Sequence, residues 1–283
     1  MKILVTGSAG LVGRATVRHC TAIGDQVFAC NRESLDISKP DAVAKVVNDS
    51  RPDAIINCAA WTDVDGCESD LVRATSANAA GPENLARAAR NAGAVLVTIS
   101  TDYVFDGTKA GFYTQRDDPN PESVYAASKL AGERRAQLAS ARTVVVRTGY
   151  IFGVGGKNFL STVIERARRG DRLRVISDAR GTPTYAPHLA ARLRVLAEMD
   201  LPGVFHVVNS GNGASFEEFT REALRMADLK ADIEPVNMSV LSRPARRPMN
   251  SRLRCVLSPA IGLPPMPSWD NALSEFIETS SRK

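Results

Sequence analysis

The sequence has 283 residues, 44% hydrophobic and 24% charged, which is enough to bury a sizeable core and excludes a disordered or fibrous chain. Its five cysteines form no C-x-x-C pair and its three histidines are scattered, so we expect free thiols and no metal site. The formal charge of +5 is spread along the chain, which favours a small anionic ligand over nucleic acid. Without a signal peptide or an apolar run of roughly 20 residues, we expect a cytoplasmic protein with no membrane partner.

Strands and helices alternate through the first half of the chain. Apolar strands are expected at 2–6, 26–30, 54–57, 94–99 and 143–147, and helices at 11–23, 41–48, 70–91 and around residues 125–129. Such alternation predicts an α/β fold with a doubly wound parallel sheet of the Rossmann type. Beyond residue 150, glycines and prolines interrupt shorter elements. We therefore expect a dinucleotide-binding domain at 1–150, to which segments near 173–207 return, and a smaller, mainly substrate-binding lobe at 151–283.

A glycine-rich turn joins the first strand to the first helix, as a dinucleotide fingerprint requires. Gly7 and Gly10 allow a tight turn and close backbone approach to a pyrophosphate, whose charge the N–H groups of the helix N-terminus attract. Gly13 would let the helix pack on the strand. An ordinary glycine-rich turn is the weaker alternative. The expected cofactor-binding residues of this segment are Gly7, Ala9, Gly10, Leu11, Val12 and Gly13.

The segment after the second strand bears on the choice of cofactor. Folds that bind NAD usually place Asp or Glu here, against the adenosine ribose, whereas this chain has Asn31 and Arg32. The Arg32 guanidinium can pair with a 2′-phosphate, so we expect NADPH, with NADH as the alternative, because a solvated arginine at a strand end is common. Asp36 and Ile37 could cover the adenine, with the Asp36 carboxylate accepting from its amino group. The alternative for Asp36 is a place in a helix N-cap.

Small or polar residues follow the third and fourth strands. Cys58, Ala59 and Ala60 leave room for a flat cofactor at the sheet edge where this fold binds ligands. Thr101 can present its hydroxyl to a substrate carbonyl oxygen, although a threonine that satisfies local backbone groups would look the same. Tyr103 follows at the same edge and suggests a polar aromatic pocket, for which core packing is the alternative.

Tyr125 and Lys129 lie four residues apart on a predicted helix, so both side chains project from one face. A nearby ammonium favours the phenolate, which would bring a phenol with a pKa of about 10 closer to use as a proton donor at neutral pH. The same spacing occurs by chance on many solvated helices. The position of this helix after the fourth strand, near Thr101 and behind a dinucleotide fingerprint, favours catalysis.

These motifs resemble those of the extended short-chain dehydrogenase/reductase family over nearly the whole chain. The matching segments are 7–13, 35–37, 57–65, 100–107, 125–133, 146–148, 153–159, 181–185 and 247–251. The resemblance implies hydride transfer from NADPH to the 4-keto group of a nucleotide-linked 6-deoxyhexulose, most directly dTDP-4-dehydrorhamnose to give dTDP-L-rhamnose. It implies a catalytic trio of Thr101, Tyr125 and Lys129, of which Tyr125 and Lys129 also contact the cofactor.

The resemblance also implies a substrate site. Its expected residues are Thr101, Asp102, Tyr103, Tyr150, Asn158 and Arg247. The chain departs from the family pattern at Trp61, Gln115, Ala126 and Tyr150, which affects the identity of the sugar more than the reaction type. Two alternatives remain: a 4-ketoreductase or epimerase acting on another nucleotide sugar, and a non-catalytic subunit resembling the regulatory subunit of methionine adenosyltransferase. A monomer or a homodimer is expected.

Overall fold

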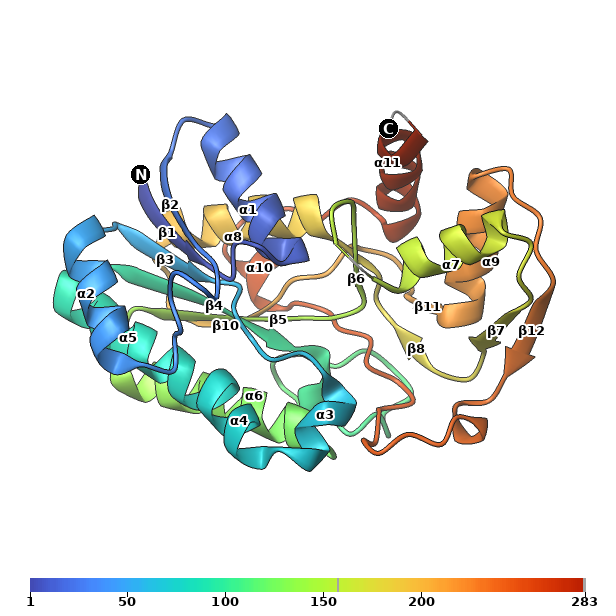
Figure 1. The fold of residues 1–283 in the computed structure, drawn as a ribbon, viewed down its shortest axis with the longest axis horizontal. Helices are drawn as coiled ribbons and strands as arrows, with labels where there is room; N and C mark the ends of the chain where they lie inside the picture. The colour runs from blue at the N-terminus through green and yellow to red at the C-terminus, as the bar shows by residue number, and fades with distance from the viewer. Residues whose placement is uncertain (157, 282–283) are drawn as a thin grey trace.

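The computed structural model describes residues 1–156 and 158–281. Six parallel strands form its central sheet, in the order β10-β5-β4-β3-β1-β2 (Figure 1). The strands are β1 (Lys2–Thr6), β2 (Gln26–Cys30), β3 (Ala54–Asn57), β4 (Val95–Thr101), β5 (Thr143–Thr148) and β10 (Gly203–His206). The fold class is thus confirmed as doubly wound α/β. The strand order reverses between β1 and β3, and ligands of such sheets bind beyond the carboxyl ends of the strands at this point.

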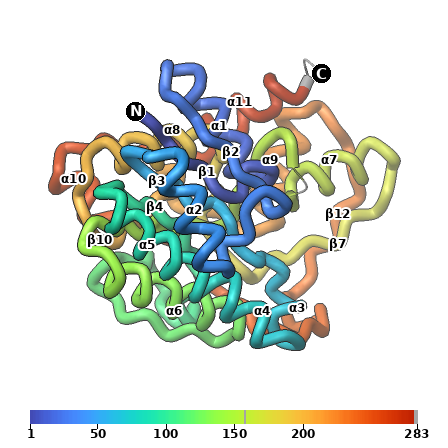
Figure 2. Tube along the Cα trace, turned by 60° about the vertical axis from the view of Figure 1, so that its left-hand side comes forward, coloured from blue at the N-terminus to red at the C-terminus, as the bar shows by residue number. Residues whose placement is uncertain are grey.

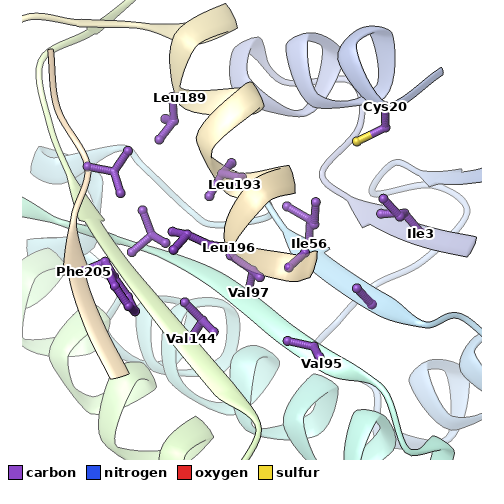
Figure 3. Packing of buried hydrophobic residues seen from close by; sticks show 14 of the residues in the cluster. Ile3, Cys20, Ile56, Val95, Val97, Val144, Leu189, Leu193, Leu196 and Phe205 are labelled. Carbon is purple, nitrogen blue, oxygen red and sulfur yellow. The ribbon is translucent and has the colours of Figure 1, made fainter. Parts of the chain in front are cut away.

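Helices cover both faces of the sheet (Figure 1). One face carries α1 (Leu11–Ala22) and α8 (Ala186–Met199), and the other carries α2 (Pro40–Ser50), α5 (Gly81–Ala92) and α6 (Val124–Ala139). This double cover explains the valine run of β5, which is buried along its whole length. Figure 3 shows side chains of the core between α8 and the sheet, among them Leu189, Leu193, Leu196, Val97, Val144 and Phe205.

The helix expected at 70–91 is interrupted. It consists of α4 (Leu71–Thr75), a π-helical turn η1 (Ser76–Ala80) and α5. The interruption lies where α6 approaches most closely, because a Cβ on Gly132 would come within 2.1 Å of the backbone oxygen of Asn78. The Asn78 amide donates to the Trp61 carbonyl and to Ser128 Oγ, so the π turn ties the segment after β3 to α6. A six-residue helix, α3 (Val64–Ser69), was not expected; Asp63 caps its N-terminus.

The C-terminal part carries three small two-stranded sheets. They pair β6 (Ile151–Phe152) with β9 (Thr184–Tyr185), β7 (Leu173–Ile176) with β12 (Ile233–Val236), and β8 (Arg180–Gly181) with β11 (Ala214–Ser215). The chain returns to the central sheet at α8 and β10. Of the expected returning segment at 173–207, α8 and β10 thus lie with the central sheet, whereas β7 pairs with β12 on the side of the molecule away from β10 (Figure 2).

Helices and short turns complete the C-terminal part. They are α7 (Phe159–Arg168), α9 (Phe216–Met226), η3 (Met238–Val240), α10 (Leu257–Ala260) and α11 (Trp269–Ser281), while a 3-10 turn η2 (Asp102–Val104) directly follows β4. An aromatic cluster that includes Phe152, Phe219 and Phe276 joins α9 and α11 to β6. Across residues 1–156 and 158–281, no helix has the length and apolar character needed to cross a membrane.

Candidate active site

A cavity of about 470 Å³ lies at the carboxyl ends of β1, β2 and β3. Four segments line it: the glycine-rich turn, residues 31–38, residues 58–61, and the stretch from α4 into η1. Ten of the expected cofactor residues are in this lining, namely Gly7, Ala9, Gly10, Asn31, Arg32, Asp36, Ile37, Cys58, Ala59 and Ala60. The cavity therefore lies at the reversal of strand order, where this fold binds ligands.

The glycine-rich turn has no room for side chains at two positions. Gly7 has a φ of +66°, and a Cβ there would come within 2.6 Å of the backbone nitrogen of Ala59. A Cβ on Gly13 would lie 2.1 Å from the carbonyl oxygen of Gly7, so this glycine lets α1 pack on the turn. Leu11 and Val12 occupy the first turn of α1 and, like Gly13, lie outside the cavity lining. The backbone is thus shaped for close approach to a pyrophosphate.

The adenosine end of the cavity has no carboxylate at the end of β2. Asn31 and Ser34 bond reciprocally and turn the chain, with the Ser34 amide donating to Asn31 Oδ1 at 2.9 Å. Arg32 is exposed and forms no ion pair with any residue in the described part of the chain. Asp36 accepts from Ser38 N and Oγ, and these bonds hold the pKa of its carboxyl below the usual value. The helix N-cap is Lys39, so the capping alternative for Asp36 is wrong.

On the opposite wall, Trp61 and Arg73 meet in a cation–π contact of 4.3 Å. Both residues line the cavity, Arg73 from α4 and Trp61 from the segment after β3. No local motif singles out Arg73, because α4 reaches the site only through the folding of this segment. The cavity fits NADPH: it offers a glycine turn at a helix N-terminus, a free guanidinium after β2 and no acidic residue in the usual ribose-binding place.

The three expected catalytic residues meet at the carboxyl end of β4. Tyr125 and Lys129 project from one face of α6, whose first turn is capped by Ser123 Oγ accepting from Ala126 N at 3.2 Å. Both side chains are buried, and Lys129 Nζ donates to the carbonyl oxygen of Ile99 at 2.7 Å. Thr101 ends β4 beside Tyr125, and its hydroxyl donates to Asp102 Oδ1 at 3.1 Å.

Burial dominates the protonation behaviour of this trio. It raises the pKa of Tyr125 above the usual value, and a hydrogen bond with the Thr101 side chain acts only partly against it. The expectation of a phenol already made more acidic is therefore wrong for the protein alone. Burial lowers the pKa of Lys129 to about 8, while the carboxylate of Glu133 acts in the raising direction. At neutral pH the phenol of Tyr125 is thus protonated, and most Lys129 side chains carry their proton as ammonium.

A small cavity of about 70 Å³ adjoins the trio and holds most of the expected substrate residues. Tyr103 meets Tyr125 edge to face, with ring centroids 6.4 Å apart. Burial raises the pKa of the Asp102 carboxyl to about 6, against hydrogen bonds from Ser251 and Thr101. The lining includes Asp102, Tyr103, Tyr150, Arg180, Arg243, Arg247 and Ser251.

Three expected residues of the substrate region have unexpected local roles. Tyr150 has a φ of +50°, and its buried hydroxyl has no hydrogen-bond partner among the described residues. Arg247 forms a two-point ion pair with Asp65 of α3, at 2.9 and 2.8 Å. Asn158 lies outside the cavity lining and caps α7, while its amide donates to the carbonyls of Gly153 and Gly156. The expectation of direct substrate contact by Asn158 is therefore not supported.

Two further features complete the site. Gln115, a departure from the family pattern, holds the C-terminal segment, since its amide donates to Cys255 Sγ and its carbonyl accepts from Val256 N. Within residues 1–156 and 158–281, no cluster of three or more His, Cys, Asp or Glu side chains could hold a metal ion.

Comparison with known proteins agrees with this geometry. A family model described as "RmlD substrate binding domain" matches residues 1–282. One curated relative is a dTDP-4-dehydrorhamnose reductase of Streptomyces griseus, 37% identical, covering 96% of this chain and 91% of its own length. Another is a probable dTDP-4,6-dihydroxy-2-methyloxan-3-one 4-ketoreductase of Streptomyces antibioticus, 35% identical, covering 97% of this chain and 94% of its own length.

Solved structures show the same likeness. A dTDP-4-dehydrorhamnose reductase from Clostridium acetobutylicum superimposes with a TM-score of 0.96 at 36% identity, covering 99% of this chain and 100% of its own. The enzyme of that name from Bacillus anthracis, solved in complex with NADP, gives 0.95 at 33% identity with the same coverage. From the match over the whole fold and from these relatives, the chain belongs to the RmlD substrate binding domain family.

Proposed function

We propose that this protein is an NADPH-dependent oxidoreductase that reduces the 4-keto group of a nucleotide-linked 6-deoxyhexulose, most directly dTDP-4-dehydrorhamnose to dTDP-L-rhamnose. The observation that carries the proposal is the buried trio of Thr101, Tyr125 and Lys129 beside a dinucleotide-shaped cavity. The names of the most similar relatives support the same reaction, and one of the matching structures contains NADP.

Each member of the trio has a distinct task. Thr101 and Tyr125 hold the carbonyl oxygen of the substrate, and Tyr125 gives its proton to that oxygen as the alcohol forms. A raised pKa keeps the phenol protonated, and therefore able to donate, at neutral pH. The ammonium of Lys129 stabilises the phenolate that remains. When bound, NADPH supplies the hydride.

The cofactor is held by residues from both ends of the large cavity. Gly7, Gly10 and the N-terminus of α1 suit the pyrophosphate, and the unpaired Arg32 suits the 2′-phosphate. Asp36 reaches the adenine region, and Lys129 is the candidate for the nicotinamide ribose. NADH, the alternative cofactor, has no 2′-phosphate and would therefore gain no binding energy from Arg32.

The substrate is assigned to the smaller cavity. Asp102 and Tyr103 lie next to the trio, while Arg247 and Arg243 bring positive charge suited to a diphosphate. Arg243 forms no ion pair within the described part of the chain, whereas Arg247 is held by Asp65. The orphaned hydroxyl of Tyr150 is suited to a hydrogen bond with the sugar.

A second candidate is a 4-ketoreductase for a different dTDP-sugar. The Streptomyces antibioticus relative favours it, at an identity close to that of the rhamnose enzymes. The regulatory-subunit alternative would not need the complete trio, so its presence favours catalysis. We also propose that the enzyme is cytoplasmic, since all five cysteines are free, which suits a reducing compartment. We propose that it is a monomer or a homodimer.

The direct test is oxidation of NADPH with dTDP-4-dehydrorhamnose as substrate, followed by the absorbance of the reduced nicotinamide. Wild-type protein should turn over, and Tyr125→Phe should lose most of kcat, on the order of 100-fold or more, with unchanged NADPH binding. Turnover only with another dTDP-4-keto sugar would support the second candidate. Tight binding to a partner enzyme without NADPH oxidation on any keto sugar would overturn both.

A further inference from the structure

One face of α6 bonds to three successive residues of β4. Tyr125 is hydrogen-bonded with the Thr101 side chain, and Lys129 Nζ donates to the Ile99 carbonyl at 2.7 Å. The next residue on this face is Glu133, whose carboxylate accepts from Ser100 Oγ. The spacing of four residues repeats, so the acid, the ammonium and this carboxylate form one row along the helix. The reaction proposed above uses the first two and leaves the third without a task.

Glu133 is buried and is held by side chains of two neighbouring strands. Its side chain is 3% exposed, and Arg147 of β5 donates to it from Nε at 3.0 Å and from Nη2 at 2.7 Å. Arg147 is the register partner of Ser100, so two neighbouring strands present donors to one carboxylate. The guanidinium also lies 5.3 Å from the ring centroid of Phe105. Such charge-assisted, two-point bonding fixes the position of the carboxylate.

We propose that Glu133, held by Arg147 and Ser100, is a positioning residue of this reductase that fixes α6 against β4 and keeps Lys129 cationic in its buried site. The inference rests on the proposed function, because a charged Lys129 matters only if Tyr125 gives up its proton there. A neutral amine could not stabilise the phenolate left after proton transfer.

The groups around the pair support this role. Burial is the main effect that lowers the pKa of Lys129, and Glu133 and Cys58 are the groups that raise it. The thiol of Cys58 is half-buried just after β3, and desolvation raises its own pKa to about 12, so it is uncharged at neutral pH. On the Tyr125 side, the titratable neighbours are Asp102, Tyr103 and Cys67. Among the described residues, Glu133 is thus the carboxyl group that acts on Lys129 in the raising direction.

The test compares pH profiles of kcat with saturating NADPH and sugar. Glu133→Gln should move the alkaline limb, where Lys129 loses its proton, down by on the order of one pH unit, because it removes the favourable charge and leaves the Arg147 cation nearby. Arg147→Gln keeps the carboxylate and should not move the limb down. A purely structural ion pair would instead give both variants the same loss of activity with an unmoved limb, which would overturn the proposal.

A matched control is available in another buried ion pair. Arg194 of α8 bonds to Asp25 at 2.5 Å, with side chains 9% and 3% exposed, far along the chain from the trio. Arg194→Gln should lower the thermal midpoint as the Glu133 variant does, but leave the alkaline limb in place. If Arg194→Gln moved the alkaline limb of the kcat profile by a similar amount, the shift in Glu133→Gln would be due to destabilisation, and the inference would be refuted.

A second readout needs neither substrate nor cofactor. In protein labelled with 13C at the lysine ε-carbons, the Lys129 signal, assigned by its loss in Lys129→Met, should titrate at lower pH in Glu133→Gln than in wild type. Unchanged titration refutes the inference even if wild type proves to act on another substrate. If Glu133→Gln does not fold, the double variant Glu133→Gln/Arg147→Met, which leaves no unpaired buried guanidinium, should give a smaller shift in the same downward direction.

Discussion

Lys129 carries a buried charge that the folded protein must hold out of water, and replacing it by methionine should stabilise the free protein. Its pKa falls from 10.5 to about 8 on folding, mainly through burial. A depression of about 2.5 pKa units corresponds to about 3.4 kcal/mol of unfavourable free energy in the charged folded state. Loss of the bond to the Ile99 carbonyl offsets about 1–2 kcal/mol of this. The expected net gain at pH 7 is therefore about 1.5–2.5 kcal/mol.

The pH dependence gives the sign of the effect. Below pH 8 the lysine is protonated in both the folded and the unfolded state, so Lys129→Met shows its full advantage there. Between pH 8 and 10.5 the folded wild type has lost the proton and the unfolded chain keeps it. The wild type therefore gains stability as the pH rises, and the difference between the two proteins shrinks.

Urea unfolding of both proteins at pH 7 and at pH 10 measures the difference directly. Lys45→Met serves as control, because Lys45 is 75% exposed and its replacement should change stability by a few tenths of a kcal/mol at most. A Lys129→Met protein that is less stable than wild type at pH 7, or whose difference from wild type does not vary with pH, would refute the reasoning.

Three other substitutions test separate parts of the site. Arg32→Ala should weaken NADPH by roughly 10- to 100-fold and NADH hardly at all, measured as dissociation constants; equal losses would dismiss the 2′-phosphate contact. Asp102→Asn should raise the free energy of unfolding at pH 7, with about 3 kcal/mol as the upper bound, because the carboxyl has a pKa of about 6 when folded against 3.8 unfolded. That gain should disappear below about pH 4, and a gain that persists at pH 3.5 would exclude the carboxylate as its source. Gly13→Ala places a Cβ 2.1 Å from the Gly7 carbonyl and should cost about 3 kcal/mol or more and abolish NADPH binding, whereas Gly111→Ala, with no atom closer than 4.0 Å, should be neutral in the same assays.

Local sequence patterns were sufficient for most of the sheet. The strands at 2–6, 26–30 and 54–57 have the bounds expected from their apolar runs. At 2–6 and 54–57 burial on both faces leaves a continuous hydrophobic signal, whereas 26–30 is a partly exposed edge strand. The π turn at 76–80 could not be predicted from local sequence, since it lies where Gly132, more than 50 residues away, packs closely against its backbone.

The candidate site, too, was predictable where its signals are local and unpredictable where they depend on tertiary structure. Motifs at strand ends located the glycine turn and the trio, since the carboxyl ends of parallel strands meet at one edge. The direction of the Tyr125 pKa shift was predicted wrongly, because the Y-x-x-x-K spacing gives the nearby charge but not the depth of burial. Glu133 could have been predicted as a member of the site, because it lies one further helical turn beyond Tyr125 and Lys129 at the same spacing. Its partner Arg147 lies on another strand and has no local signal.

The bond between Asp65 and Arg247 makes the order of synthesis matter. A helix as short as α3 is not stable in isolation, and here its Asp65 receives donors from Ala245 N and from the Arg247 guanidinium, near the end of the chain. The short helix α3 can therefore reach its final, packed form only after residues 245–247 have been synthesised and have folded back on it.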